Sequence, residues 1–310
     1  MTVAARSPAR ASRWTRLTDQ PYLLLSLTSL FWAGNAIVGR SVAGELAPAT
    51  LSFLRWSGAF LVVLPFAFRH LAGDWSAIRA RLGIMVLISF VGVSAFNTLQ
   101  YTSLQYTTAL NVLLLQSTGP LFVAAWSLAL LGVRLTLAQL GGILVSMVGV
   151  MIILLKGDLA ALGNISFNRG DLIFLFALAM FGCYPVLTLR RPAINGMSFL
   201  AFTFGCGTLM LIPMVAWELT TRPLPAVTAG NALAVAYVAI FPSFIAYLCY
   251  NRGVAIIGAN RAAPFFHLIP VFGAAMAITM LGEKLEPFHL VGFVMVLAGV
   301  IVAARRPAST

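Results

Sequence analysis

Long apolar runs separated by short polar breaks dominate the pattern along this chain. The run from Leu82 to Val133 carries no charged residue and is too long for one membrane helix of about 20 residues. It does not alternate at every second position, as a spanning β-strand would, and the polar break at 105–108 divides it into a helical hairpin. The pattern predicts ten membrane-spanning helices, at about 21–43, 47–70, 81–104, 108–131, 135–155, 170–190, 196–218, 229–251, 259–281 and 286–304.

The composition excludes a soluble protein. Of the 310 residues, 60% are hydrophobic and 9% are charged, whereas soluble domains carry roughly 25% charged residues. The mean hydropathy of +0.95 agrees with this. Ten helices use about 200 residues, so no room remains for a soluble catalytic domain of about 50 or more. The expected fold class is an all-α membrane protein.

The net charge of +12 is distributed as membrane topology requires, which argues against a nucleic-acid partner. With a cytoplasmic N-terminus and ten helices, 14 of the 20 Lys and Arg residues are cytoplasmic, 5 are external and Arg55 lies within a helix. Cytoplasmic loops carry such an excess. We therefore expect both termini in the cytoplasm, with residues 1–20 and 305–310 as tails and the lipid bilayer around the rest.

The chain also repeats itself. A shift of 150 residues aligns 109–150 with 259–300, with 12 identities in 42 positions and no gap. Pro120 recurs as Pro270, and the Leu-Gly-x-basic-Leu turn at 131–135 recurs at 281–285. An odd number of helices in each half inverts the second half relative to the first, as in many secondary transporters. The expected units are a first five-helix repeat at 21–155, an external linker at 156–169 and a second, inverted repeat at 170–304.

Three features carry a resemblance to a known family: the segment from Leu30 to Asn35, the Leu54-Arg55-Trp56 sequence, and the repeated proline with its Leu-Gly-x-basic helix end. With them the chain resembles the drug/metabolite transporter superfamily, in its ten-helix EamA-like branch, from about residue 20 to 304. Within that branch it is most similar to bacterial exporters of amino acids, including the aromatic ones. The resemblance implies a central cavity lined by helices 1, 3, 4, 6, 8 and 9, and a location in the bacterial inner membrane.

Polar side chains within the predicted helices are candidates for a substrate site, because polar groups in hydrocarbon usually face protein or water. Trp32 and Asn35 lie three residues apart on the first helix and so share a face. Asn97, Gln100 and Tyr101 form a similar stripe on the third helix. Each set either lines a cavity or makes hydrogen bonds between helices, and we expect the cavity.

Further candidates surround the prolines predicted to bend helices, Pro120 and Pro270. Pro120 frees a backbone carbonyl one turn earlier, which either accepts from a substrate or is satisfied by Gln116 or Ser117. Aromatic side chains stack on apolar substrates, although most pack against protein or lipid. The complete set of expected substrate-binding residues is Trp32, Asn35, Asn97, Gln100, Tyr101, Gln116, Tyr184, Tyr247, Phe265 and His267.

Two of the candidates, Arg55 and His267, can carry a positive charge. Arg55 lies deep in a predicted helix, where insertion of a cation costs roughly 2.5–3.5 kcal/mol. It is either a clamp on backbone carbonyls or a site for a substrate carboxylate, and the resemblance favours the clamp. His267 is the mid-helix group that titrates near neutrality. It is either a proton switch or a neutral imidazole bonded to a neighbour or to substrate, and we favour the neutral ring.

The motifs of other functions are missing from the sequence. It contains no Walker A, HExxH or GxSxG motif, no Asp or Glu near the middle of a predicted helix, and no metal-site spacing among its three cysteines. We expect no enzyme activity, metal or cofactor. The sequence predicts a secondary transporter that exports amino acids or related small metabolites by alternating access. A drug or other metabolite carrier is the alternative, and a membrane-embedded enzyme is a remote one; a monomer is compatible with the sequence.

Overall fold

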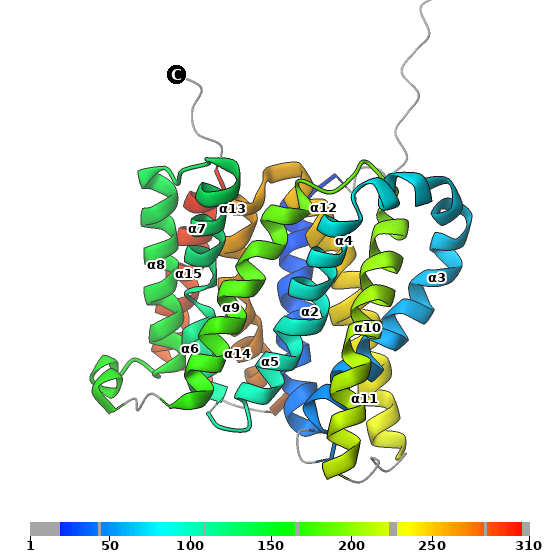
Figure 1. Ribbon diagram of the computed structural model, residues 1–310. Coiled ribbons are helices and arrows are strands. Elements are labelled where there is room, and N and C mark those ends of the chain that lie inside the picture. Colours follow the sequence, from blue (N-terminus) through cyan, green and yellow to red (C-terminus); the bar gives the residue numbers. More distant parts are fainter. Residues whose placement is uncertain are drawn as a thin grey trace, which may run out of the picture.

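The computed structural model describes residues 19–42, 45–107, 109–164, 168–222, 228–281 and 284–305. Within these ranges the chain is helical and has no strand, and nine helices are long and apolar enough to cross a membrane (Figure 1). The elements are α2 (Pro21–Ser41), α3 (Pro48–Ala80), α4 (Leu82–Ser89), η1 (Phe90–Ala95), α5 (Phe96–Ser103), α6 (Ala109–Gln116), α7 (Gly119–Leu131), α8 (Leu137–Leu154), η2 (Leu159–Asn164), α9 (Arg169–Thr188), α10 (Gly196–Thr221), α11 (Ala229–Ala239), η3 (Ile240–Ile245), α12 (Ala246–Ile257), α13 (Ala259–Ala262), η4 (Ala263–His267), α14 (Leu268–Leu281) and α15 (Pro287–Ala304).

The predicted spans differ most from the observed helices at two places. α3 continues to Ala80, ten residues beyond the expected end, and its 33 residues span about 50 Å, more than the roughly 30 Å of a hydrocarbon layer. Its last turns carry Arg69 and Arg79 at exposed positions and Asp74 at a half-buried one, as a helix leaving that layer would. The predicted span 259–281 is not one continuous helix, because the 3-10 turn η4 separates α13 from α14. It is not among the nine apolar helices.

The irregular points of the fold recur 150 residues apart. The π-helical turn η1 spans 90–95 and the π-helical turn η3 spans 240–245, each inside a long apolar segment. The break between α6 and α7 falls at 117–118, and the junction of η4 with α14 falls at 267–268. Pro120 is the second residue of α7 and Pro270 the third of α14, where a missing backbone N–H costs no helical hydrogen bond. Both prolines therefore start a helix after a break.

A crossing between α8 and α15 brings four glycines together. A Cβ atom on Gly142 would lie 2.6 Å from the carbonyl oxygen of Gly299, and one on Gly149 would lie 2.9 Å from that of Gly292. Gly142 and Gly292 are 150 residues apart, as are Gly149 and Gly299. Glycine allows this close backbone approach because it has no side chain. The two helices run antiparallel, and their contact is the most extensive between any two elements.

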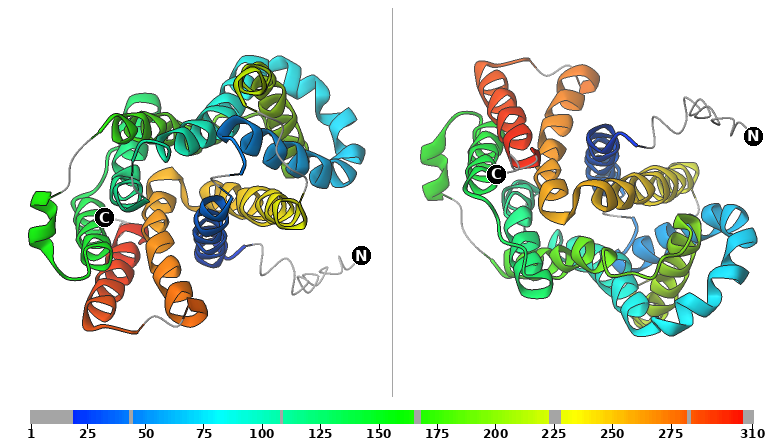
Figure 2. Two further views of the ribbon diagram at one scale, coloured as in Figure 1. Left: turned by 90° about the horizontal axis from the view of Figure 1, so that it is seen from below. Right: turned by 90° about the horizontal axis from the view of Figure 1, so that it is seen from above.

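The beginning of α2 and the end of α15 lie at the same face of the bundle, because the Tyr22 hydroxyl donates a hydrogen bond of 3.4 Å to the carbonyl oxygen of Ala304. Figure 2 shows α8 and α15 at one end of the bundle and α3, α10 and α11 at the other. On the opposite face, Glu218 of α10 accepts from the backbone N–H groups of Ala49 and Thr50 and so caps α3. Helices α2, α5, α9 and α12 lie between the two ends and surround the interior.

Candidate functional site

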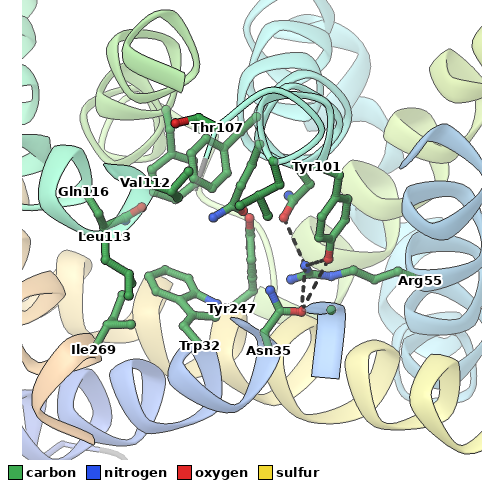
Figure 3. Close-up of a pocket in the computed structure, with 16 residues that line it drawn as sticks. Trp32, Asn35, Arg55, Tyr101, Thr107, Val112, Leu113, Gln116, Tyr247 and Ile269 are labelled. Carbon is green, nitrogen blue, oxygen red and sulfur yellow. Dashed lines mark hydrogen bonds between the residues drawn. The ribbon is translucent and has the colours of Figure 1, made fainter. Parts of the chain in front are cut away.

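A cavity of ≈ 170 Å³ lies between α2, α3, α5, α6, α9, α12 and α14. A space of this size holds several waters or one small molecule. Figure 3 shows polar groups around Arg55 at one end and apolar side chains at the other. The lining residues are Trp32, Asn35, Gly39, Arg55, Phe96, Asn97, Gln100, Tyr101, Leu104, Thr107, Val112, Leu113, Gln116, Phe181, Tyr247 and Ile269.

The guanidinium of Arg55 organises the polar end. Its Nη1 donates to Asn35 Oδ1 at 3.2 Å, to Asn97 Oδ1 at 3.0 Å and to the Tyr101 hydroxyl at 3.1 Å. Its Nε donates to Ser243 Oγ at 2.6 Å. The side chain is only 1% exposed, so these neutral acceptors replace its water shell. Arg55 therefore joins α2, α3, α5 and the η3 turn at one point.

The π-helical turns supply acceptors that an α-helix would use internally. Pro242 lies in η3, and its carbonyl oxygen accepts from Arg55 Nη2 at 3.3 Å and from the Trp32 indole N–H at 3.0 Å. Gly92, 150 residues earlier in η1, accepts from the Tyr247 hydroxyl at 2.6 Å. Such turns are frequent at functional sites. Here they fix the orientation of two aromatic rings that line the cavity.

Aromatic and aliphatic side chains form the other wall. The Trp32 ring lies 6.1 Å from that of Phe181 and 5.9 Å from that of Tyr247. Leu113 and Ile269 line the far end, opposite Arg55 (Figure 3). The cavity thus combines a cationic, hydrogen-bonding end with an apolar end. That arrangement suits a molecule with an anionic or polar head and an apolar body.

Arg55 has no counter-ion among the described residues. The ion pair found there joins Arg252 and Asp19, both exposed, and not Arg55. A buried cation without a carboxylate is costly, and the neutral acceptors around Arg55 do not neutralise it. The cavity therefore presents a net positive end, where an anionic group would gain both charge and hydrogen bonds.

The structure brings most of the predicted residues to this cavity. Trp32, Asn35, Asn97, Gln100, Tyr101, Gln116, Tyr247 and Arg55 all line it. Tyr184, Phe265 and His267 do not. Tyr184 is buried outside the lining, and its hydroxyl donates to Asn251 Oδ1. Phe265 packs against Tyr22, with ring centroids 6.1 Å apart. Pro120 and Pro270 are also outside the lining and act at the helix starts.

His267 is directed between helices and away from the cavity. Its Nε2 lies 2.8 Å from the backbone oxygen of Ser117, and its Nδ1 lies 2.5 Å from Ser146 Oγ of α8. The side chain is 1% exposed. Both ring nitrogens thus have partners within the helix packing.

Several groups of the cavity are not predicted from the sequence. Phe96, Phe181 and Leu113 line the cavity but look like ordinary core residues in an apolar helix. A proline inside a predicted helix signals a free carbonyl one turn earlier; for Pro242 this is the carbonyl of Val238, which accepts from the Ser243 hydroxyl. The π-helical geometry that makes the carbonyl of Pro242 itself available has no such signal in one sequence.

The cavity approaches the face of the bundle opposite Tyr22 and Ala304. Gly39 lies near the end of α2, and Leu104 and Thr107 follow α5. The Thr107 hydroxyl donates to the carboxylate of Asp171 at 2.5 Å, and Asn111 donates to both oxygens of that carboxylate. Asp171 is fully buried in the first turn of α9. It ties α9 to the segment that borders the cavity mouth.

Comparison with known proteins finds one family twice in this chain. The EamA-like transporter family matches residues 20–155 and again residues 168–305. A transporter named YyaM from Bacillus subtilis is 26% identical over 285 residues, covering 91% of this chain and 93% of that protein. A probable terminal-alkyne amino-acid exporter from Streptantibioticus cattleyicolor is 26% identical over 295 residues, covering 91% and 92%.

A solved crystal structure with this fold is among those similar to this chain. It superposes with a TM-score of 0.75 at 19% identity, and the alignment covers 94% of this chain and 97% of that one. The identity is too low to carry more than the fold.

Proposed function

Because the chain belongs to the EamA-like transporter family, we propose that it is a secondary transporter that exports amino acids or related small metabolites, including aromatic ones. The membrane is the inner membrane of a bacterial cell, and transport proceeds by alternating access. The exporter similar to this chain is named for amino acids, which supports the substrate class. The protein carries out no covalent chemistry in this proposal.

The proposed topology is ten crossings in two inverted repeats, residues 21–155 and 170–304, with an external linker at 156–169 and cytoplasmic termini. The two family matches and the contact between Tyr22 and Ala304 support it, since ends at one face require an even number of crossings. The broken segment from α13 to α14, ninth in chain order, is the crossing that completes the ten. A reporter fused after Thr310 should be cytoplasmic, and one inserted at Gly163 should be external.

The proposed substrate class rests mainly on the buried guanidinium of Arg55 at one end of the cavity. An amino acid offers a carboxylate to the cationic end and a side chain to the apolar end of the cavity. Amide oxygens of Gln100 and Gln116 are suited to its ammonium group, because amides accept as well as donate. In this proposal Arg55 has a dual role: it clamps helices in the empty cavity and pairs with the carboxylate when substrate is bound.

A carrier for uncharged drugs is the second candidate, and the apolar end formed by Leu113, Val112 and Ile269 favours it. Such a substrate would leave Arg55 without a counter-ion, so we rank it below the amino acids. A nucleotide sugar fits less well, since its two phosphates would face one lining cation.

Flux measurements in proteoliposomes test the function. The purified protein should accelerate exchange of one or more amino acids from a panel of the twenty, run with and without a pH gradient. Flux of uncharged drugs with none of the amino acids would replace the first candidate by the second.

A further inference from the structure

Three polar side chains of α12 and α13 are buried with unpaired atoms, in a stretch of chain that the pairing of Arg252 with Asp19 places toward the start of α2. Tyr250 is 1% exposed, Asn251 6% and Asn260 8%. Within the described ranges the Tyr250 hydroxyl, the Asn251 Nδ2 and both amide atoms of Asn260 find no hydrogen-bond partner. A buried polar group without a hydrogen-bond partner destabilises the folded protein. A permanently dry core gains nothing from these residue types.

One layer of aromatic rings separates this group from the cavity. The Tyr250 ring lies 5.2 Å from that of Trp32, which lines the cavity, and stacks on Phe266 at 5.6 Å. Tyr184 bridges the two sides, since its ring lies 5.6 Å from that of Tyr247 and its hydroxyl donates to Asn251 Oδ1 at 2.9 Å. The unpaired atoms of Tyr250 and Asn251 therefore lie directly beyond the cavity wall, and Asn260 follows in α13, which contacts α12.

Polar residues occupy equivalent positions of α5, which borders the cavity, and of α12, which continues beyond its wall. α5 and α12 each begin directly after a π-helical turn, and the turns are 150 residues apart. Asn97, Gln100 and Tyr101 are the second, fifth and sixth residues of α5 and line the cavity. The second, fifth and sixth residues of α12 are Tyr247, Tyr250 and Asn251. One stripe is open to the cavity, and its counterpart is largely closed.

We infer that Tyr250, Asn251 and Asn260 form a second polar site, which lines the route to the cytoplasmic face when the bundle opens there. This rests on the proposed transport function and topology. In alternating access, inverted repeats exchange roles around a central site. In the state open to the cytoplasm, the buried stripe of α12 would therefore line the cavity, as the α5 stripe does in this structure. The site offers hydroxyl and amide groups and takes the polar head of a small zwitterion on its way to Arg55. The Tyr184–Asn251 hydrogen bond and the stacked rings hold it shut in this state.

Thiol labelling from each side of the membrane tests the inference. In a full-length background with Cys183, Cys206 and Cys249 replaced by alanine, Asn251→Cys and Asn260→Cys are made separately. Each is treated with a membrane-impermeant maleimide in inside-out and in right-side-out vesicles. Thr203→Cys is the matched control, because Thr203 is 1% exposed in α10, its hydroxyl donates to the backbone of its own helix, and it is not a counterpart of a lining residue.

We expect both thiols to be labelled from the cytoplasmic side, at least about tenfold faster than Thr203→Cys, because a minor state populated at roughly 0.1–10% is enough to expose them. Gln100→Cys should be labelled from the external side. Labelling of Asn251→Cys and Asn260→Cys no faster than the control, or only from outside, overturns the inference. Size-exclusion profiles in detergent identify a variant that fails to fold, and the other one then decides. One-sided labelling without amino-acid flux would remove the proposed substrate class and leave the route in place.

Discussion

His267 Nε2 donates a hydrogen bond of 2.8 Å to the backbone carbonyl oxygen of Ser117, the residue 150 positions earlier in the chain. A carbonyl only accepts, so Nε2 carries a proton, whereas the contact between Nδ1 and the Ser146 hydroxyl allows either group to donate. Ser117 follows α6 and His267 ends η4, so the bond joins two equivalent helix breaks. Each of the two lies directly before a helix that starts around a proline.

This contact predicts a structural effect for His267→Ala. Removing the ring leaves the Ser117 carbonyl unpaired in the core, which costs about 1–3 kcal/mol. Thermal unfolding in detergent should move to lower temperature, while the effect of an imposed pH gradient on flux stays that of the wild type. Loss of gradient-driven accumulation at an unchanged melting temperature would instead make His267 the proton switch.

The glycine crossing predicts opposite outcomes for two neighbours. Gly142→Ala places a methyl 2.6 Å from the carbonyl oxygen of Gly299, and backbone cannot move aside easily. Overpacking of this kind costs typically about 1–3 kcal/mol. Gly141→Ala meets nothing within 4 Å and removes backbone freedom from the unfolded chain, so it should be neutral or slightly stabilising. Melting temperatures of the two variants check this, and equal values would contradict the close crossing.

Gln100→Leu tests the polar stripe on α5. The side chain lines the cavity at its polar wall, so the change should lower the rate of amino-acid flux without affecting insertion or melting. Thr102→Val is the control, because Thr102 bonds the backbone of its own helix and lies outside the lining. If the two variants transport equally well, the stripe is packing and not a binding wall.

Arg55→Lys tests the cationic end. Lysine keeps the charge but loses the planar fork that reaches several acceptors at once. Hydrogen bonds to charged groups are worth roughly 1.5–3 kcal/mol, so apparent affinity should fall about 10- to 150-fold. Arg79→Lys, at an exposed site of the same helix, should leave KM unchanged. An Arg55→Lys variant with normal KM and a lower melting temperature would reduce Arg55 to a helix clamp.

The sequence predicted much of this fold because lipid forces every backbone group into helices, which makes apolar length a strong signal. It also predicted the α5 stripe, since Asn97, Gln100 and Tyr101 repeat at helical spacing. It could not place His267, because helix rotation decides whether a mid-helix ring meets a cavity or a neighbour. The π-helical turns were also missed, since Phe90 to Ala95 reads as ordinary helix. Those turns set the rotation of α5 and α12, and hence the cavity.

The most direct measurement compares an amino acid with its carboxamide in the same proteoliposomes. Phenylalanine and phenylalaninamide share the ring and the amino group and differ at the carboxylate. If the carboxylate pairs with Arg55, the wild type should move phenylalanine at least about tenfold faster, since one charge-assisted contact exceeds 1.4 kcal/mol. In Arg55→Gln the preference should vanish. Equal flux of the two compounds through the wild type, or a preference that survives Arg55→Gln, would contradict a carboxylate site at Arg55.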